Sequence, residues 1–200
     1  MNRIITIGRE FGSGGREVGK RIAEGLGIAY YDKEILSEIA KRTELAESYV
    51  RQVVERRPIV YYPITTGHTF YTNADPTAQY TNSILTEQNN VIRDLASNSD
   101  CVIVGRCADY ILRDLKPLRL FIYSDMEHKI KRCREKAEVD EHMSDRAMRR
   151  YIKRIDRGRA SYYQHYTGRV WGDRLNYDLC INTASNSIKE IVSSVIAIYQ

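Results

Sequence analysis

The chain has 200 residues, of which 42% are hydrophobic and 28% charged, and its formal net charge is +5. This length can bury one substantial core, so we expect a single domain over residues 1–200. No apolar run approaches the roughly 20 residues that a membrane span needs, which excludes an integral membrane protein. The small positive excess also argues against a dedicated nucleic-acid-binding module.

The N-terminal residues and the cysteines indicate a cytoplasmic protein. Residues 1–6 lead directly into an apolar strand pattern, without the features of a secretory leader. The four cysteines have no C-x-x-C spacing, and free thiols in a reducing compartment are the simplest interpretation. The four histidines have no metal-binding spacing, so we expect no metal site built from a cluster of protein ligands.

The first predicted elements are a strand, a glycine-rich loop and a helix. Residues 4–7 are all β-branched, and the run F-G-S-G-G follows soon after them. Apolar side chains then recur every four positions, which predicts a helix over residues 15–26 with Gly27 as its C-cap. This order is typical of the opening of a phosphate-binding α/β domain.

The middle of the chain has a weaker pattern. A second short strand is predicted over residues 28–31, followed by two helices. Residues 57–80 contain three prolines and five aromatic residues without a sustained period. We interpret them as an irregular insertion, either a flap on the substrate side or a partner surface. Near the end of this stretch Asp75-Pro76 resembles a helix start, and we expect a helix from there toward Ser97.

The second half alternates strands with helices. Three more strands are predicted, over residues 101–104, 118–123 and 177–181. Three helices are expected, over residues 126–137, 145–163 and 188–196, with Ser144 as a candidate N-cap of the second. Strands that alternate with helices predict a parallel sheet covered on both faces, with the site at the carboxyl ends of the strands.

The glycine-rich loop is the first candidate site. Its backbone N–H groups can converge on phosphate oxygens, and the following helix adds partial positive charge. If Gly15 is the second glycine of a P-loop, Arg16 stands at the lysine and Glu17 at the Ser/Thr. Arg16 can bind phosphates as a planar fork, whereas Glu17 would need Mg²⁺ between itself and an anion. We therefore expect the loop to bind the ATP phosphates, through Gly12, Ser13, Gly14, Gly15, Arg16 and Glu17. The alternative is a glycine turn that only lets helix and strand pack closely.

A basic segment is the second candidate. Residues 129–159 hold 12 Lys or Arg against 6 Asp or Glu, a net of +6 by subtraction, which accounts for the whole excess of the chain. Such a local excess predicts an anion site, and the alternative is a helix face that only contacts solvent. Two nearby residues also have two interpretations. Asp125 is either a helix N-cap, which we favour, or a magnesium ligand, and Trp171 is either a core residue, which we favour, or a contact for adenine.

Four stretches occur in an order that is more specific than any one of them: I-I-T-I-G-R-E-F-G-S-G-G-R-E-V-G-K, Y-Y-D-K-E-I-L, V-I-V-G-R-C-A-D and Y-D-L-C-I-N-T. They span nearly the whole chain, which resembles the cytidylate kinase-like family. The resemblance implies a P-loop NTPase fold, a three-layer α/β/α domain with a five-stranded parallel sheet and an arginine-rich helical lid. The core would comprise about residues 1–56, 81–128 and 175–200, the acceptor-side insertion about 57–80, and the lid region about 129–174.

The resemblance also implies roles for single residues. Asp32 matches an Asp that begins the acceptor-side motif of bacterial cytidylate kinases. Arg106 would bind the phosphate of the acceptor, unless it is an ordinary strand-end residue. The run D-R-G-R-A resembles the D-R-x-R-A run of cytidylate kinases, which implies that Asp156 and Arg159 face the acceptor. The transferring phosphates would be approached by arginines of the lid, namely Arg132, Arg154 and Arg157. Where cytidylate kinases have an Asp that helps to read the base, this chain has Cys107.

We therefore expect an ATP-dependent phosphotransferase whose acceptor is a nucleoside monophosphate such as CMP or dCMP. ATP and Mg²⁺ would be its cofactors, and Arg16, Arg154 and Arg157 its catalytic residues. Three alternatives fit the same residues. They are a kinase of another small molecule, a nucleotide-binding protein of this fold with little catalysis, and a nucleic-acid-binding module whose tyrosines stack on bases. The sequence is compatible with a homo-oligomer.

Overall fold

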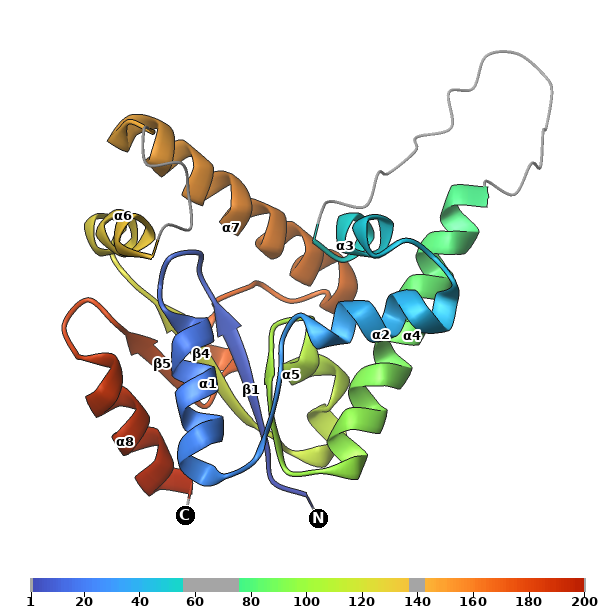
Figure 1. Cartoon of the computed structure of the whole chain (residues 1–200), viewed down its shortest axis with the longest axis horizontal. Coiled ribbons are helices and arrows are strands. Elements are labelled where there is room, and N and C mark those ends of the chain that lie inside the picture. The colour runs from blue at the N-terminus through green and yellow to red at the C-terminus, as the bar shows by residue number, and fades with distance from the viewer. Residues whose placement is uncertain (1, 56–75, 137–142, 200) are drawn as a thin grey trace.

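The computed structural model describes residues 2–55, 76–136 and 143–199. A five-stranded sheet lies at its centre, with all strands parallel and in the order β2-β3-β1-β4-β5 (Figure 1). The strands are β1 (Ile4–Arg9), β2 (Ala29–Tyr31), β3 (Cys101–Val104), β4 (Leu118–Tyr123) and β5 (Leu179–Asn182). Because β1 lies between β3 and β4, the strand order reverses beside it. Open α/β sheets bind their ligands at such a point.

Helices cover both faces of the sheet. One face packs against α1 (Gly15–Leu26) and α8 (Ile188–Tyr199). The other face packs against α2 (Glu34–Thr43), α3 (Glu47–Glu55), α4 (Pro76–Asn98) and α5 (Ala108–Ile111). The expected three-layer α/β/α architecture is confirmed.

The strands are apolar on both sides because both sides are buried. In β3, Val102 and Val104 belong to the core cluster under α1 and α8. Cys101 and Ile103 alternate with them and belong to the cluster on the other face. Successive side chains of a strand point to opposite faces, so a strand between two helical layers becomes a continuous apolar run.

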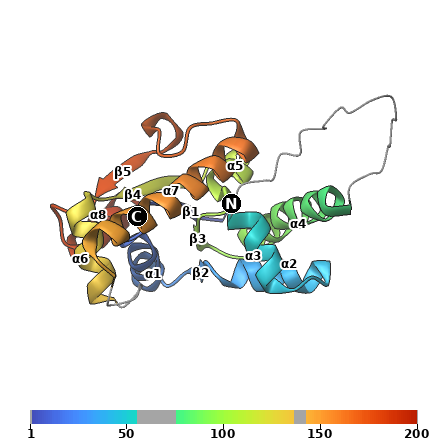
Figure 2. The ribbon, with the colours of Figure 1, turned by 90° about the horizontal axis from the view of Figure 1, so that it is seen from above.

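Two further helices lie at the carboxyl ends of the strands. These are α6 (Met126–Glu135) and α7 (Asp145–Thr167), and Figure 2 shows α7 crossing over the sheet. A small apolar cluster joins them, formed by Ile130, Cys133, Met148 and Ile152. Phe11, from the glycine-rich loop, packs against this cluster. The basic helices therefore rest directly on the loop.

Both predicted caps of these helices are confirmed. The Asp125 carboxylate accepts a hydrogen bond from the amide of His128 at 2.7 Å, at the start of α6. The Ser144 hydroxyl accepts one from the amide of Ala147 at 3.4 Å, at the start of α7. Asp125 therefore has the capping role that we favoured.

The predicted strands agree with the structure to within two residues at each end, and α4 begins at Pro76 as expected. Residues 76–80 are thus helical, although they fall within the stretch interpreted as an irregular insertion; the remainder, 57–75, lies outside the described residues. The helix predicted over residues 145–163 continues to Thr167, where Gly168 in a left-handed conformation ends it. We did not predict α5 or the two 3₁₀ turns at Arg113–Leu115 and Arg174–Asn176.

Across the described residues, no helix is both long and apolar enough to cross a membrane.

Candidate active site

The loop between β1 and α1 has the geometry of an anion cradle. Gly12 and Gly14 have φ values of 74° and 81°, a region that favours glycine, and α1 begins at Gly15 directly after them. The first N–H groups of a helix have no partner within the helix. Within the described parts of the chain, the amides of residues 14–17 donate to no protein acceptor. They are therefore available to a ligand at the positive end of α1.

A small cavity of about 160 Å³ lies at this loop. Among the described residues that line it, five are basic: Arg9, Arg16, Arg132, Lys136 and Arg159. The single acidic residue among them is Glu17. The predicted loop residues Gly12 and Gly14 also line this cavity, whereas Ser13 is fully buried and its hydroxyl donates to the carbonyl of Glu10. The cavity can hold an anion about as large as the terminal phosphate group of a polyphosphate.

Glu17 is held by cations rather than free for a metal ion. Its Oε1 lies 2.7 Å from Arg21, and its Oε2 lies 2.5 Å from Arg132 and 3.5 Å from Lys136. Partial burial acts to raise the pKa of this carboxyl, but the hydrogen bond from Arg132 and the neighbouring charges hold it below its usual value. With both oxygens in use, Glu17 does not fit as a Mg²⁺ ligand in this arrangement. Its role here is to fix Arg132 at the wall of the small cavity.

A second, larger cavity of about 1130 Å³ opens beside the first. Eight of the described residues that line it are basic, namely Arg9, Arg16, Lys33, Arg51, Arg106, Arg154, Arg157 and Arg159. The only carboxylate among these lining residues is Asp109. Burial raises the pKa of Asp109, whose carboxylate accepts a hydrogen bond from Tyr163 at 2.6 Å. The large cavity is therefore strongly positive and suits an anionic molecule.

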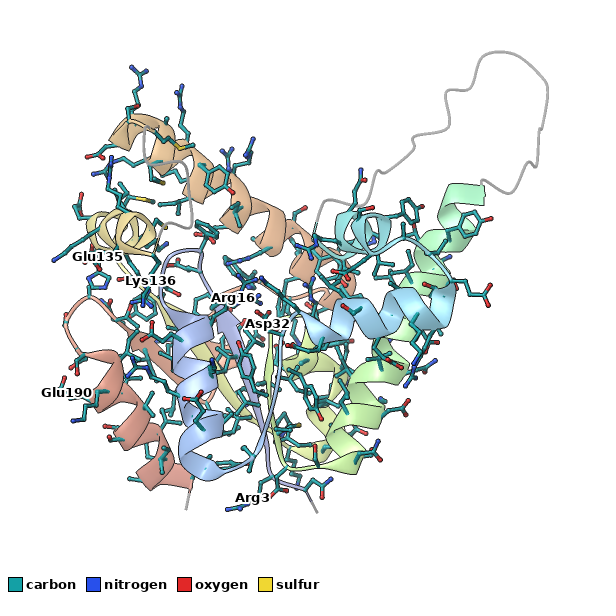
Figure 3. All side chains as sticks on the ribbon, viewed as in Figure 1. Arg3, Arg16, Asp32, Glu135, Lys136 and Glu190 are labelled. Carbon is teal, nitrogen blue, oxygen red and sulfur yellow. The ribbon has the colours of Figure 1, made fainter. Side chains whose placement is uncertain are left out.

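Asp32 lines neither cavity but pairs with two residues that line both, and 7% of its side chain is exposed. Its Oδ2 is 2.8 Å from Nε of Arg16, and its Oδ1 is 3.5 Å from Nη2 of Arg9. Figure 3 shows Arg16 and Asp32 side by side at the carboxyl end of the sheet, opposite the end that carries Arg3. The structure thus brings two residues together that were predicted for different substrates.

Arg106 and Cys107 follow β3 at the floor of the large cavity. Both have left-handed backbone conformations, with φ values of 59° and 55°, and both are buried. The carbonyl of Arg106 accepts a hydrogen bond from Gln88, which itself accepts one from Tyr162. Burial raises the pKa of the Cys107 thiol well above its usual value, so this residue is a neutral part of the floor. Arg106 thus lines the large cavity from a backbone that the hydrogen bond of Gln88 holds in place.

Asp156 has a different place from the one expected. Its Oδ1 accepts a hydrogen bond from the amide of Phe11 at 2.7 Å, and its Oδ2 lies 3.4 Å from Nζ of Lys129. The same ammonium lies 2.5 Å from Glu10, and the Lys129 side chain is only 6% exposed. The Asp156 carboxylate is therefore used to fasten the loop to α6 and α7, and not to face an acceptor.

The other lid arginines lie nearer to their expected places. Arg159 lines both cavities, and its Nη1 donates to the carbonyl of Arg9 at 3.0 Å. Arg154 and Arg157 line the large cavity from exposed positions on α7. Arg154 lies over the ring of Tyr151, with 5.2 Å between the guanidinium carbon and the ring centre. Arg159 also lies 3.7 Å from Asp156, whereas Arg154 and Arg157 form no ion pair among the described residues and can turn toward a ligand.

Trp171 packs edge-on against Phe121, with ring centres 5.3 Å apart. It also packs against the apolar core of the α2–α5 face, which favours the core interpretation. It also lines the large cavity, but not the small cavity at the loop. Trp171 is thus a core residue at the edge of the large cavity.

Sequence reasoning missed two residues, Arg9 and Lys129. Arg9 is the last residue of β1 and lines both cavities, and a charged residue within a buried strand was the available signal. Lys129 was hidden among the many basic residues of its segment. Only the structure distinguishes it, because it is buried while Lys131, Arg134 and Lys136 on the same segment are exposed.

A family model described as the cytidylate kinase-like family matches residues 4–185. No curated protein matches the chain. An uncharacterized protein from Eubacterium ventriosum ATCC 27560 is 30% identical with a TM-score of 0.71, and the match covers 99% of this chain and 98% of that one.

Two shikimate kinases are similar in structure at low identity. The enzyme from Bacteroides thetaiotaomicron is 13% identical with a TM-score of 0.58, covering 98% of this chain and 97% of that one. The enzyme from Acinetobacter baumannii, in complex with shikimate, is 14% identical with a TM-score of 0.51, covering 99% and 92%. They show that the fold is that of the P-loop kinases. Because the family model matches nearly the whole length of this chain, the chain belongs to the cytidylate kinase-like family.

Proposed function

We propose that this chain transfers the γ-phosphoryl group of ATP to a nucleoside monophosphate, with CMP or dCMP as the preferred acceptor. The observation that carries the proposal is the pair of adjoining cavities. One lies at the open amides at the start of α1, and the other has, among its described lining residues, eight basic side chains and one carboxylate. A neutral acceptor would leave this charge unused, whereas a monophosphate would neutralise part of it.

The reaction requires positioning and charge neutralisation more than a covalent intermediate. An oxygen of the acceptor phosphate forms a bond to the γ-phosphorus, the bond from that phosphorus to the β-bridging oxygen breaks, and ADP leaves. The loop amides of residues 14–17 would hold the donor phosphates. Arg106 would hold the acceptor phosphate from the cavity floor, and Arg154 and Arg157 would neutralise charge from α7.

Magnesium would enter on the phosphates of ATP, where it neutralises the charge that develops during transfer. The carboxylates at the loop do not favour a site of their own for it. Glu17 is surrounded by three cations, and Asp32 lies between Arg9 and Arg16. Among the described residues, no group of three or more His, Cys, Asp or Glu side chains is placed to bind a metal ion.

A second candidate is a kinase of another phosphorylated small molecule. Cys107 favours it, because this buried neutral thiol lies where cytidylate kinases have an Asp that helps to read the base. The charge of the large cavity supports a phosphorylated acceptor in both cases. The two candidates differ only in what the rest of the acceptor contacts.

The test is a coupled assay of ADP release with Mg-ATP across CMP, dCMP, UMP, AMP, GMP and simple phosphorylated and unphosphorylated metabolites. We expect turnover with a pyrimidine monophosphate. In Arg106→Ala, kcat/KM should fall by about 10- to 100-fold, as the loss of a charge-assisted hydrogen bond to phosphate predicts. Arg106→Lys should recover part of the loss, and Arg174→Ala, an exposed residue outside both cavities, should have no effect.

Each outcome decides between the candidates. Activity only with a phosphorylated metabolite that is not a nucleotide would select the second candidate. Activity with an unphosphorylated acceptor, or none with any acceptor, would contradict both. Unchanged turnover in Arg106→Ala would remove Arg106 from the acceptor site.

A further inference from the structure

The side chain of Arg9 occupies space that two glycines leave for it. A Cβ atom on Gly15 would lie 2.5 Å from Cβ of Arg9, and one on Gly105 would lie 1.8 Å from its Nη1. Real Cβ atoms do not approach other atoms so closely. A side chain at position 15 would clash with the Cβ of residue 9, and one at position 105 would displace the guanidinium of Arg9. The residue after β3 thus leaves the guanidinium its present place, and the first residue of α1 leaves room for the base of the side chain.

The surroundings of Arg9 are unfavourable for a cation without a ligand. Its side chain is 12% exposed, and its Nε is buried and has no hydrogen-bond partner in the described structure. Its one carboxylate neighbour, Asp32, is 3.5 Å away and makes a shorter contact with Arg16. Burial, and next the charge of Arg159, lower the pKa of Arg9 to about 9. A buried cation that lacks full pairing destabilises the folded chain.

Arg9 is also central in position. It lies at the carboxyl end of the central strand, and it lines both the small cavity at the loop and the large cavity beside it. Three basic residues among the described lining residues line both cavities. Arg16 is 46% exposed and Arg159 23%, whereas Arg9 is 12% exposed and packs against the two glycines. The guanidinium of Arg9 is therefore placed to contact a ligand that extends from one cavity into the other.

We propose that Arg9 is a phosphate-binding residue at the junction of the two cavities, where its guanidinium contacts the phosphoryl group in transfer. It takes the place of the lysine that the loop lacks, from the end of β1 instead of from the start of α1. The role in transfer rests on the proposed function, whereas the contact with a phosphate oxygen does not. Asp32 holds the orientation of the guanidinium.

The first experiment measures binding and folding without catalysis. The Tm of the wild type, Arg9→Met and Arg9→Lys is recorded with and without sodium pyrophosphate and Mg-ATP, and the Kd of each ligand is measured by calorimetry. The control is Arg3→Met, the same replacement at the opposite end of β1 (Figure 3). We expect Arg9→Met to have a ligand-free Tm equal to or above that of the wild type. Its Kd for pyrophosphate should rise by at least about 10-fold, while Arg9→Lys gives an intermediate Kd and Arg3→Met the wild-type value.

The second experiment measures turnover of the acceptor found in the screen, for which kcat of Arg9→Met should fall by at least about 100-fold. Wild-type affinity for pyrophosphate and ATP in Arg9→Met would overturn the inference and leave the proposed function standing. A wild type that binds no pyrophosphate would also overturn it. A lower ligand-free Tm in both Arg9→Met and Arg9→Lys, or failure of both to fold, would show that the arginine is structural. Loss of pyrophosphate binding in a protein that phosphorylates no acceptor would support the phosphate contact and contradict the proposed function.

Discussion

The two sides of the site use charge in opposite ways. On the side of α6, buried or half-buried cations meet carboxylates within the protein, as Lys129 does with Glu10 and Asp156 and Arg132 does with Glu17. Among the described residues that line the large cavity, eight are basic and Asp109 alone carries a carboxylate. In the first arrangement the charges are paired within the protein, and these pairs hold the loop in shape. In the second, the positive charge lacks a partner until an anion binds. The comparison thus separates residues that build the site from residues that would bind a ligand.

The substitution with the largest expected effect on this comparison is Lys129→Met. The replacement leaves the carboxylates of Glu10 and Asp156 close together without their shared cation. We expect the free energy of unfolding to fall by roughly 3 kcal/mol, the scale of a broken buried ion pair. Urea denaturation measures this loss.

The matched control is Lys131→Met, two residues further along α6 on its exposed side. It should change the free energy of unfolding by less than about 0.5 kcal/mol. A loss below about 1 kcal/mol in Lys129→Met would show that the network does not hold the loop, since exposed pairs have that magnitude.

A smaller effect is expected in the large cavity, for Arg154→Met. Because Arg154 is exposed on α7 and contacts the ring of Tyr151 but no carboxylate, its loss should leave stability unchanged to within about 0.5 kcal/mol. We expect kcat/KM with the phosphorylated acceptor to fall about 10-fold, equivalent to about 1.4 kcal/mol of transition-state binding. Arg150→Met, one turn earlier on α7 and outside both cavities, is the control. Equal kinetics in the two variants would exclude Arg154 from the site.

The smallest expected effect concerns Asp109. Because burial raises its pKa, the folded chain holds this proton more tightly than the unfolded chain does. Its contribution to stability is therefore present at acid pH and is lost as the pH rises from the usual value of 3.8 through the raised pKa. Asp109→Asn keeps an oxygen that can accept the hydrogen bond from Tyr163. Its stability should lack this dependence on pH. Urea denaturation of both proteins at a series of pH values should show wild-type stability falling relative to the variant as pH rises; a constant difference would contradict the shift.

Much of the fold was predictable because local pattern and burial agree. Apolar runs such as Cys101–Val104 are buried on both faces, so every position carries the signal and the bounds are correct. Caps at Asp125 and Ser144 were predictable because a short polar side chain before an amphipathic run has a direct local role. The single turn of α5 was not, since four residues are too few to establish a period.

The site was less predictable because its charges are sorted by burial and not by sequence. The residues of the phosphate loop could be located from its glycines, but the surroundings of Glu17 depend on Arg132, 115 residues away. Asp156 occurs in a run that suggests an acceptor contact, yet its partners are the amide of Phe11 and the ammonium of Lys129. A single sequence cannot tell which of many arginines and lysines will be covered by other elements.

The packing of Arg9 against Gly15 also constrains how such a chain can evolve. The Cβ atoms of positions 9 and 15 would lie 2.5 Å apart, so a side chain at position 15 would clash with any residue at position 9 that has a Cβ atom. Shortening residue 9 to alanine would not remove this clash. The lysine position of a P-loop falls on Arg16, which coexists with Arg9 at the small cavity. Lineages of this family should therefore keep glycine at position 15 and vary the cations of the loop at positions 9 and 16.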